Sequence, residues 1–135
     1  MLFAGQAQKE FYVNEAHARV DALLHPAAEG ETNAPPAAPA AGECWLVGNA
    51  PTGNWSGHAE ELACFTAGTW IFLKPLDGMQ VFDRSAGQFL LYRDGWQAPS
   101  TPAAPMDGAI IDTEARTAIA SLIAVLGNAG ILPPG

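Results

Sequence analysis

The chain has 135 residues, enough for one domain of ordinary size, and apolar residues make up 49% of it, so we expect a packed core. The formal net charge is −8, and no cluster of Lys and Arg offsets it, so we expect no nucleic-acid partner. The 14 Gly and 11 Pro residues favour short strands and turns over a helical bundle.

The first residues predict no targeting signal. Polar residues follow Met1 to Gly5 at once, and no basic segment precedes an apolar one. No apolar run approaches the roughly 20 residues needed to cross a bilayer. We therefore expect a protein made in the bacterial cytoplasm without a signal peptide and not inserted into a membrane.

Residues 1–26 predict an N-terminal helix, running from about Gln6 to Leu24. This stretch contains no Gly or Pro, and Pro26 stops the helix because the residue before a proline avoids the α region. Apolar residues recur at helical spacing: Val13, Ala16, Val20 and Leu23. The row needs a partner surface, since an isolated helix of this length is marginal in water.

The middle of the chain predicts a linker and then a β unit. Residues 27–42 are rich in Ala and Pro, which favours a polyproline II linker. Residues 43–97 contain short apolar and aromatic runs between Gly-containing turns, typical of strands: Cys44–Val47, Leu62–Phe65, Thr69–Leu73, Met79–Asp83 and Gln88–Tyr92. No crossover helix has room to form, so we predict a small antiparallel meander or barrel-like unit.

A second Pro-rich connector, residues 98–111, leads to a C-terminal helix and tail at 112–135. Asp112 can cap this helix, and its apolar residues again recur at helical spacing: Ala115, Ile119, Leu122 and Leu126. The seam resembles a coiled coil of about two heptads, too short to hold an oligomer by itself. It packs either on the protein's own sheet or on another subunit. The predicted fold class is α+β.

The two cysteines are predicted to be free, buried thiols. Cys44 and Cys64 each lie in a predicted strand, where a thiol behaves as a small apolar group. A disulfide between them would need an oxidising compartment, so this alternative is less favoured.

Three tryptophans follow closely on a turn glycine, in Gly53-Asn54-Trp55, Gly68-Thr69-Trp70 and Gly95-Trp96. A buried indole at such a place would be a core or subunit contact. An exposed one offers a flat apolar face on which a sugar ring can stack. The candidate ligand-binding residues are therefore Trp55, Trp70, Trp96 and His58.

No pattern in the chain predicts catalysis or a metal site. In the stretch Gly53 to Gly57, Ser56 lies one place later than a nucleophile elbow requires. The possible metal ligands lack any recognised spacing: Cys44, Cys64, His58, Glu60 and Glu61. We therefore expect a protein that is not an enzyme and that needs no metal or other cofactor.

Several stretches, in order, resemble a family of domains of unknown function encoded by phage and gene-transfer-agent genes. They include an opening at Gly5 to Glu10, a Pro-Pro-x-x-Pro-x-x-Gly stretch at Pro35 to Gly42, and a Thr-Gly-x-Trp-x-Gly-His loop at Thr52 to His58. A strand at Gly68 to Trp70 and a turn at Pro75 to Gly78 follow. The resemblance covers residues 5 to 97.

The resemblance implies a virion component linked with tail fibres or spikes, with no catalytic residues to carry over. We expect a structural and attachment module assembled as a homo-oligomer, a trimer in preference to a dimer, with other virion proteins and cell-surface polysaccharide as partners. The candidate subunit contacts are Val13, Val20, Leu23, Ile119, Leu122 and Leu126. The alternative is a monomeric carbohydrate-binding or adaptor domain whose helices pack on its own sheet.

Overall fold

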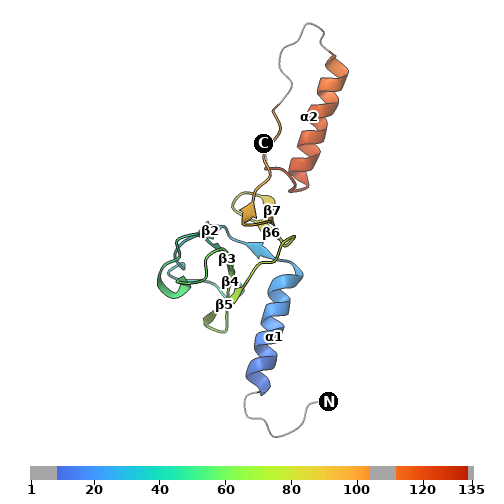
Figure 1. The fold of residues 1–135 in the computed structure, drawn as a ribbon. Coiled ribbons are helices and arrows are strands. Elements are labelled where there is room, and N and C mark those ends of the chain that lie inside the picture. Colours follow the sequence, from blue (N-terminus) through green and yellow to red (C-terminus); the bar gives the residue numbers. More distant parts are fainter. Residues whose placement is uncertain (1–8, 104–111, 134–135) are drawn as a thin grey trace.

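The computed structural model describes residues 9–103 and 112–133, in which two helices project from opposite ends of a central β unit (Figure 1). Helix α1 spans Lys9–Leu24 and helix α2 spans Thr113–Asn128. The strands are β1 (Ala27–Ala28), β2 (Glu31–Thr32), β3 (Cys44–Val47), β4 (Leu62–Thr66), β5 (Thr69–Leu73), β6 (Gln80–Asp83), β7 (Gln88–Tyr92) and β8 (Trp96–Gln97). The predicted α+β class is confirmed.

Some predicted features lie outside the described residues. They are the start of the first helix at Gln6, the family-like opening from Gly5 to Gln8, and residues 104–111 of the second connector.

The strands form two four-stranded sheets, ordered β1-β6-β7-β8 and β2-β3-β4-β5. All five predicted strands are present, and the hairpins β4–β5 and β6–β7 are antiparallel as predicted. The prediction of one antiparallel meander needs a correction, because each sheet also has a parallel pair. Strand β1 runs parallel to β6, and β2 runs parallel to β3.

The parallel strands come from the segment 27–42, which was predicted to be a linker. Ala28 is fully buried in the core, and its carbonyl oxygen accepts a hydrogen bond of 2.9 Å from Arg84 N. Between β1 and β2, Gly30 has a φ of +156°, and a Cβ there would lie 3.2 Å from Ser85 Oγ and 3.7 Å from Trp45 Cζ3. The backbone crosses from one sheet to the other here because glycine fits this narrow space.

One core lies between the two sheets and receives side chains from both. Its buried members are Ala28, Leu46, Leu62, Cys64, Ile71, Leu73, Val81 and Leu90. Helix α1 contacts this core through its small residues Ala18 and Ala22. Arg19 Nη1 adds a hydrogen bond of 3.3 Å to Phe72 O.

Helix α2 is joined to the β unit by the turn that follows it. None of the α2 residues is buried. After the helix, Gly130 O accepts a hydrogen bond of 2.7 Å from Phe89 N of β7, and Leu132 is buried. Within 9–103 and 112–133, neither helix has the length and apolar character that crossing a membrane requires.

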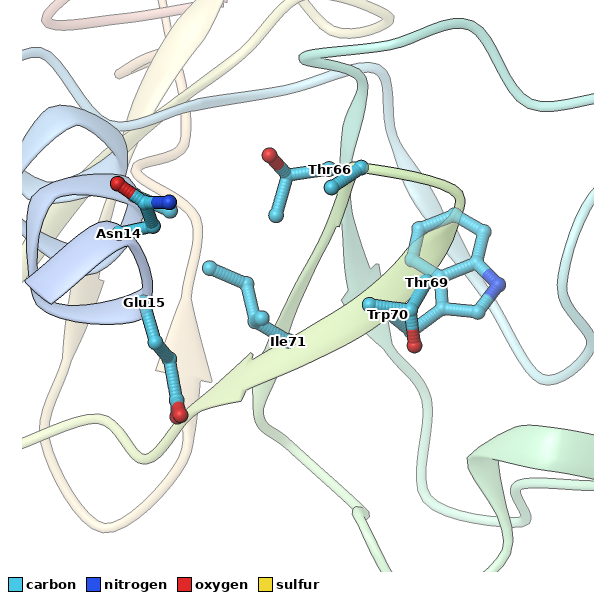
Figure 2. A pocket seen from close by; sticks show the side chains of 8 residues that line it. Asn14, Glu15, Thr66, Thr69, Trp70 and Ile71 are labelled. Atoms are coloured by element: carbon cyan, nitrogen blue, oxygen red, sulfur yellow. The ribbon is translucent and has the colours of Figure 1, made fainter. Parts of the chain in front are cut away.

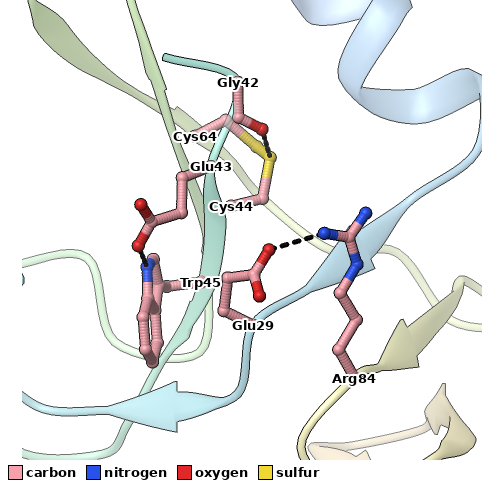
Figure 3. The surroundings of a disulfide bond; sticks show 7 residues. All are labelled: Glu29, Gly42, Glu43, Cys44, Trp45, Cys64 and Arg84. Atoms are coloured by element: carbon pink, nitrogen blue, oxygen red, sulfur yellow. Dashed lines mark hydrogen bonds and ion pairs between the residues drawn. A yellow bond between two sulfur atoms is a disulfide. The ribbon is translucent and has the colours of Figure 1, made fainter. Parts of the chain in front are cut away.

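A disulfide joins Cys44 of β3 to Cys64 of β4 (Figure 3). The strand register places these residues opposite each other, with Cα atoms 4.1 Å apart. Glu43 O accepts a hydrogen bond of 2.8 Å from Phe65 N, so the cysteines occupy the adjacent non-hydrogen-bonded position, where opposite residues come closest. The prediction of free thiols was wrong, because it could not include the register that brings them together.

We expect the disulfide to stabilise the β unit. Its sequence separation of 20 corresponds to about 3 kcal/mol in the chain-entropy estimate. Thermal unfolding followed by circular dichroism should therefore give a lower Tm for the double variant Cys44→Ala/Cys64→Ala than for the oxidised protein. A reducing agent should lower the Tm of the wild type and leave that of the double variant unchanged. A wild-type Tm insensitive to reduction would contradict this role.

Candidate functional site

Aromatic side chains gather on the side of the β2-β3-β4-β5 sheet that faces away from the core. Side chains alternate along a strand, so Ile71 and Leu73 point into the core while Trp70 and Phe72 point to the opposite side. We call the residues on this side the aromatic face: Trp45, Trp55, Phe65, Trp70 and Phe72.

Trp55 is the buried centre of the aromatic face. A 3₁₀ turn, Gly53–Trp55, carries it into the space above the sheet, where it is 0% exposed. Its ring meets Trp70 edge-on, with centroids 5.0 Å apart and an interplanar angle of 88°. Phe65 packs on the same Trp70 ring with centroids 5.0 Å apart. The structure thus removes Trp55 from the predicted sugar-stacking residues, because its packing leaves no face open to a ligand.

His58 also packs onto the aromatic face. Its ring stacks on Phe72 with centroids 3.6 Å apart and an interplanar angle of 7°. Its Nδ1 lies 2.9 Å from Glu61 Oε2. The stacking on Phe72 holds the loop from Gly48 to Glu61 against the sheet, and the contact with Glu61 orients the imidazole within that loop.

Trp96 lies apart from the other predicted ligand-binding residues, on β8 of the other sheet. Its Nε1 donates a hydrogen bond of 2.8 Å to Glu60 O, and its ring meets Tyr92 edge-on at 5.2 Å. Tyr92 OH in turn donates to Glu60 Oε2 at 3.1 Å. The structure therefore brings Trp55, Trp70 and His58 together on the aromatic face. Trp96 lies elsewhere, where its hydrogen bond links the Glu60 backbone to the β7–β8 hairpin.

Tyr92 has a perturbed environment. Burial raises the pKa of Tyr92 above its ordinary value, and the hydrogen bond to Glu60 raises it further. The negative charges of Glu60, Asp77 and Asp94 act in the same direction, because they disfavour a phenolate beside them.

A cleft of about 400 Å³ lies between α1 and the β4–β5 turn (Figure 2). Figure 2 shows the Ile71 side chain reaching toward α1, while the Trp70 indole lies on the other side of β5. The remaining lining residues are Asn14, Glu15, Ala18, Thr66, Ala67 and Thr69. Trp70 also lines this cleft, but its indole points to the other side of β5, so the cleft lacks the stacking platform that the sequence predicted there.

A second cleft, of about 620 Å³, lies beside the disulfide (Figure 3). Its side chains include an indole, two carboxylates and a guanidinium, from Trp45, Glu29, Glu43 and Arg84. This group was not predicted from the sequence, because Glu29, Glu43 and Arg84 come from three separate segments. The close spacing of Glu43 and Trp45 in the sequence was the one local indication that these two side chains lie together.

The six predicted subunit contacts are all exposed on the two helices. Their exposed fractions range from 37% to 62%: Val13, Val20, Leu23, Ile119, Leu122 and Leu126. Tyr12, Leu24 and Val125 add to the exposed apolar surface of the same helices. On α1, the small residues Ala18 and Ala22 pack against the core, whereas Val13, Val20 and Leu23 are exposed.

No metal-ligand group is assembled within residues 9–103 and 112–133. There, no group of three or more His, Cys, Asp and Glu side chains could hold a metal ion. The imidazole of His58, two residues after Ser56, is engaged with Phe72 and Glu61.

The chain matches the model of a family described as "Protein of unknown function (DUF2793)" over residues 13–97. This range is more than half of the chain, and the chain belongs to that family. It starts in α1, includes both sheets and ends at the last residue of β8. The prediction of a family of domains of unknown function is thereby confirmed for residues 13–97, whereas the match carries no phage or tail-fibre description. No curated protein matches the chain.

Trp55 should be essential to the fold. Removing its fully buried ring in Trp55→Ala should lower the free energy of unfolding by about 3–5 kcal/mol, as large-to-small core substitutions do. Denaturant unfolding followed by circular dichroism measures this loss. Trp96→Phe, in which a partly exposed ring becomes a smaller ring, is the control and should lose much less. Wild-type stability in Trp55→Ala would contradict the assignment of Trp55 to the core.

Tyr92 should make stability fall at alkaline pH. Below about pH 10 the phenol is neutral in both the folded and the unfolded chain. Above it the unfolded chain ionises first, because the folded-state pKa of Tyr92 is raised, so the free energy of unfolding decreases as pH rises. Denaturant unfolding at about pH 9 and about pH 11 should show a smaller decrease for Tyr92→Phe than for the wild type. Tyr12→Phe is the matched control, and equal decreases in wild type and Tyr92→Phe would contradict the assignment.

Proposed function

We propose that this protein is a non-catalytic structural and attachment module of a phage-like particle, a component of a tail fibre or spike, that assembles as a homotrimer through its helices. The observation that carries the proposal is the pair of helices whose apolar rows stay exposed at opposite ends of a packed β unit (Figure 1).

Helix α2 has the apolar composition of a helix that is buried against another molecule. Residues 117–128 contain no charged side chain, yet Leu122 is 62% exposed and Val125 61% exposed. A helix that is apolar on all sides is normally buried. Ile119, Leu122 and Leu126 repeat at the spacing of a coiled-coil seam, which is complementary to the same seam on a second copy of the chain. The occupant that fits α2 is therefore another subunit.

Helix α1 supports the same assignment by the way it contacts its own sheet. Ala18 and Ala22 touch the core, and Arg19 bonds to Phe72 O, so this side of the helix is used within the subunit. Val13 and Val20 remain 38% and 56% exposed. In the monomeric alternative the large apolar residues of α1 would pack on the sheet. Because Ala18 and Ala22 pack there and the large residues stay exposed, the oligomer is favoured.

The phage setting is supported by the ordered stretches that resemble phage and gene-transfer-agent domains, from the Pro-rich segment at Pro35 to Gly42 to the turn at Pro75 to Gly78. In this proposal the protein is made in the bacterial cytoplasm and assembled into the particle with other virion proteins. The β unit is the exposed part, in a position to contact cell-surface polysaccharide. The Cys44–Cys64 disulfide is compatible with an oxidising exterior, where such bonds persist.

Light scattering on a sizing column tests the assembly at two concentrations. The wild type should have a mass three times 14.1 kDa, and Val20→Glu combined with Ile119→Glu should reduce the mass to 14.1 kDa while the β-unit circular dichroism persists. Leu76→Glu is the matched control. It puts the same charge on a leucine that is 75% exposed outside the helices, so it should leave the mass unchanged. A wild-type mass of 14.1 kDa at both concentrations would overturn the proposal.

A further inference from the structure

We propose that the cleft beside the Cys44–Cys64 disulfide, here called the Trp45 cleft, binds a neutral saccharide. Its lining residues are Glu29, Ala40, Ala41, Gly42, Glu43, Trp45 and Arg84. A volume of about 620 Å³ is within the range of small-molecule sites. The inference deepens the attachment role proposed above and rests on it, because it gives that role a site and a class of ligand.

Trp45 provides a fixed aromatic platform. Its Nε1 donates to Glu43 Oε1, and the other oxygen of that carboxylate accepts a hydrogen bond of 2.7 Å from Ala40 N. The Gly30 backbone lies close to the ring, since a Cβ there would be 3.7 Å from Cζ3. The indole is thus held in place before a ligand arrives, which lowers the entropy cost of binding. Its flat apolar surface suits the C–H face of a pyranose ring.

Glu29 and Arg84 provide polar groups beside the platform (Figure 3). Arg84 Nη1 lies 2.7 Å from Glu29 Oε1, and the two side chains are 59% and 34% exposed. A guanidinium has five N–H donors and a carboxylate has several lone pairs, so this single contact leaves both groups with bonding capacity. Neighbouring sugar hydroxyls, which both donate and accept, match such a donor–acceptor pair.

The charge of the cleft selects against acidic sugars. Two carboxylates and one guanidinium line it, and the whole chain has a formal net charge of −8. A uronic acid or a phosphorylated sugar would bring a further negative charge next to Glu29 and Glu43, which is unfavourable. The favoured ligand is therefore a neutral saccharide.

Backbone features keep the cleft open and its wall in place. Gly42 has a φ of +86°, with nothing within 4 Å of the position of a Cβ, so no side chain fills the space. The disulfide fixes β3, which carries Trp45, to β4. The Trp45 cleft also differs from the predicted sugar site, because Trp55 is buried and Trp70 packs edge-on against it.

Saturation-transfer NMR on the full chain, with chitotriose, cellotriose and maltotriose as probes, tests the proposal. At least one probe should receive saturation from the wild type, and tryptophan fluorescence titration then gives its Kd. Arg84→Ala should raise the Kd about tenfold or more, as expected for a lost hydrogen bond to a charged group. This variant should fold, because Arg84 is exposed and surface ion pairs contribute little to stability. Trp45→Phe should also bind more weakly.

The matched control is Trp70→Phe, which changes an indole outside the Trp45 cleft and should keep the wild-type Kd. A hyaluronan tetrasaccharide is the acidic probe and should not bind. The proposal is overturned if no neutral probe receives saturation, if Arg84→Ala binds like the wild type, or if the acidic probe binds equally well.

The mass of the same samples separates this proposal from the assembly proposal. If the wild type is a monomer that binds saccharide through Arg84, the homotrimer proposal is overturned and the saccharide proposal is retained. If the wild type is a trimer that transfers no saturation to a saccharide, the saccharide proposal is overturned and the homotrimer proposal is retained.

Discussion

The passage of the chain from β1 to β2 is the constraint on which the rest of the structure depends. Within six residues, Ala27 to Thr32, the backbone pairs first with β6 of one sheet and then with β3 of the other. Because Ala28 is buried and Gly30 has no side chain, the two sheets can meet over one core. The same crossing places Glu29 beside Arg84, so the segment that joins the sheets also forms a wall of the Trp45 cleft.

Local patterns in the sequence were sufficient to predict both helices and the five longer strands. Helical spacing predicted α1 and α2, and Gly-containing turns predicted the hairpins. Both patterns involve residues close together in the chain, so they can be read without knowing the tertiary structure. Strands β1 and β2 were not predictable in this way, since two residues such as Ala27 and Ala28 show no alternation. They exist because longer strands elsewhere offer them hydrogen-bonding edges.

The candidate sites were predicted less well than the fold, because they depend on register and on long-range packing. The disulfide follows from Cys44 lying opposite Cys64, and the burial of Trp55 follows from a loop that folds back over the sheet. The Trp45 cleft combines residues from three separate segments. The apolar rows on the two helices, in contrast, can be read from helical spacing alone, and the structure leaves their large residues exposed; their role as subunit contacts stays a prediction.

The placement of the helices at opposite ends of the β unit restricts the symmetry of an assembly. In the proposed homotrimer, copies related by a single rotation axis would lie parallel, with the helices at both ends of each β unit meeting their counterparts. In that proposed assembly the β units would form a ring around the axis, and each would present its own Trp45 cleft. If the proposed saccharide site takes units of a repetitive polymer, binding by such an assembly would be multivalent, and avidity would compensate for a weak affinity at each cleft.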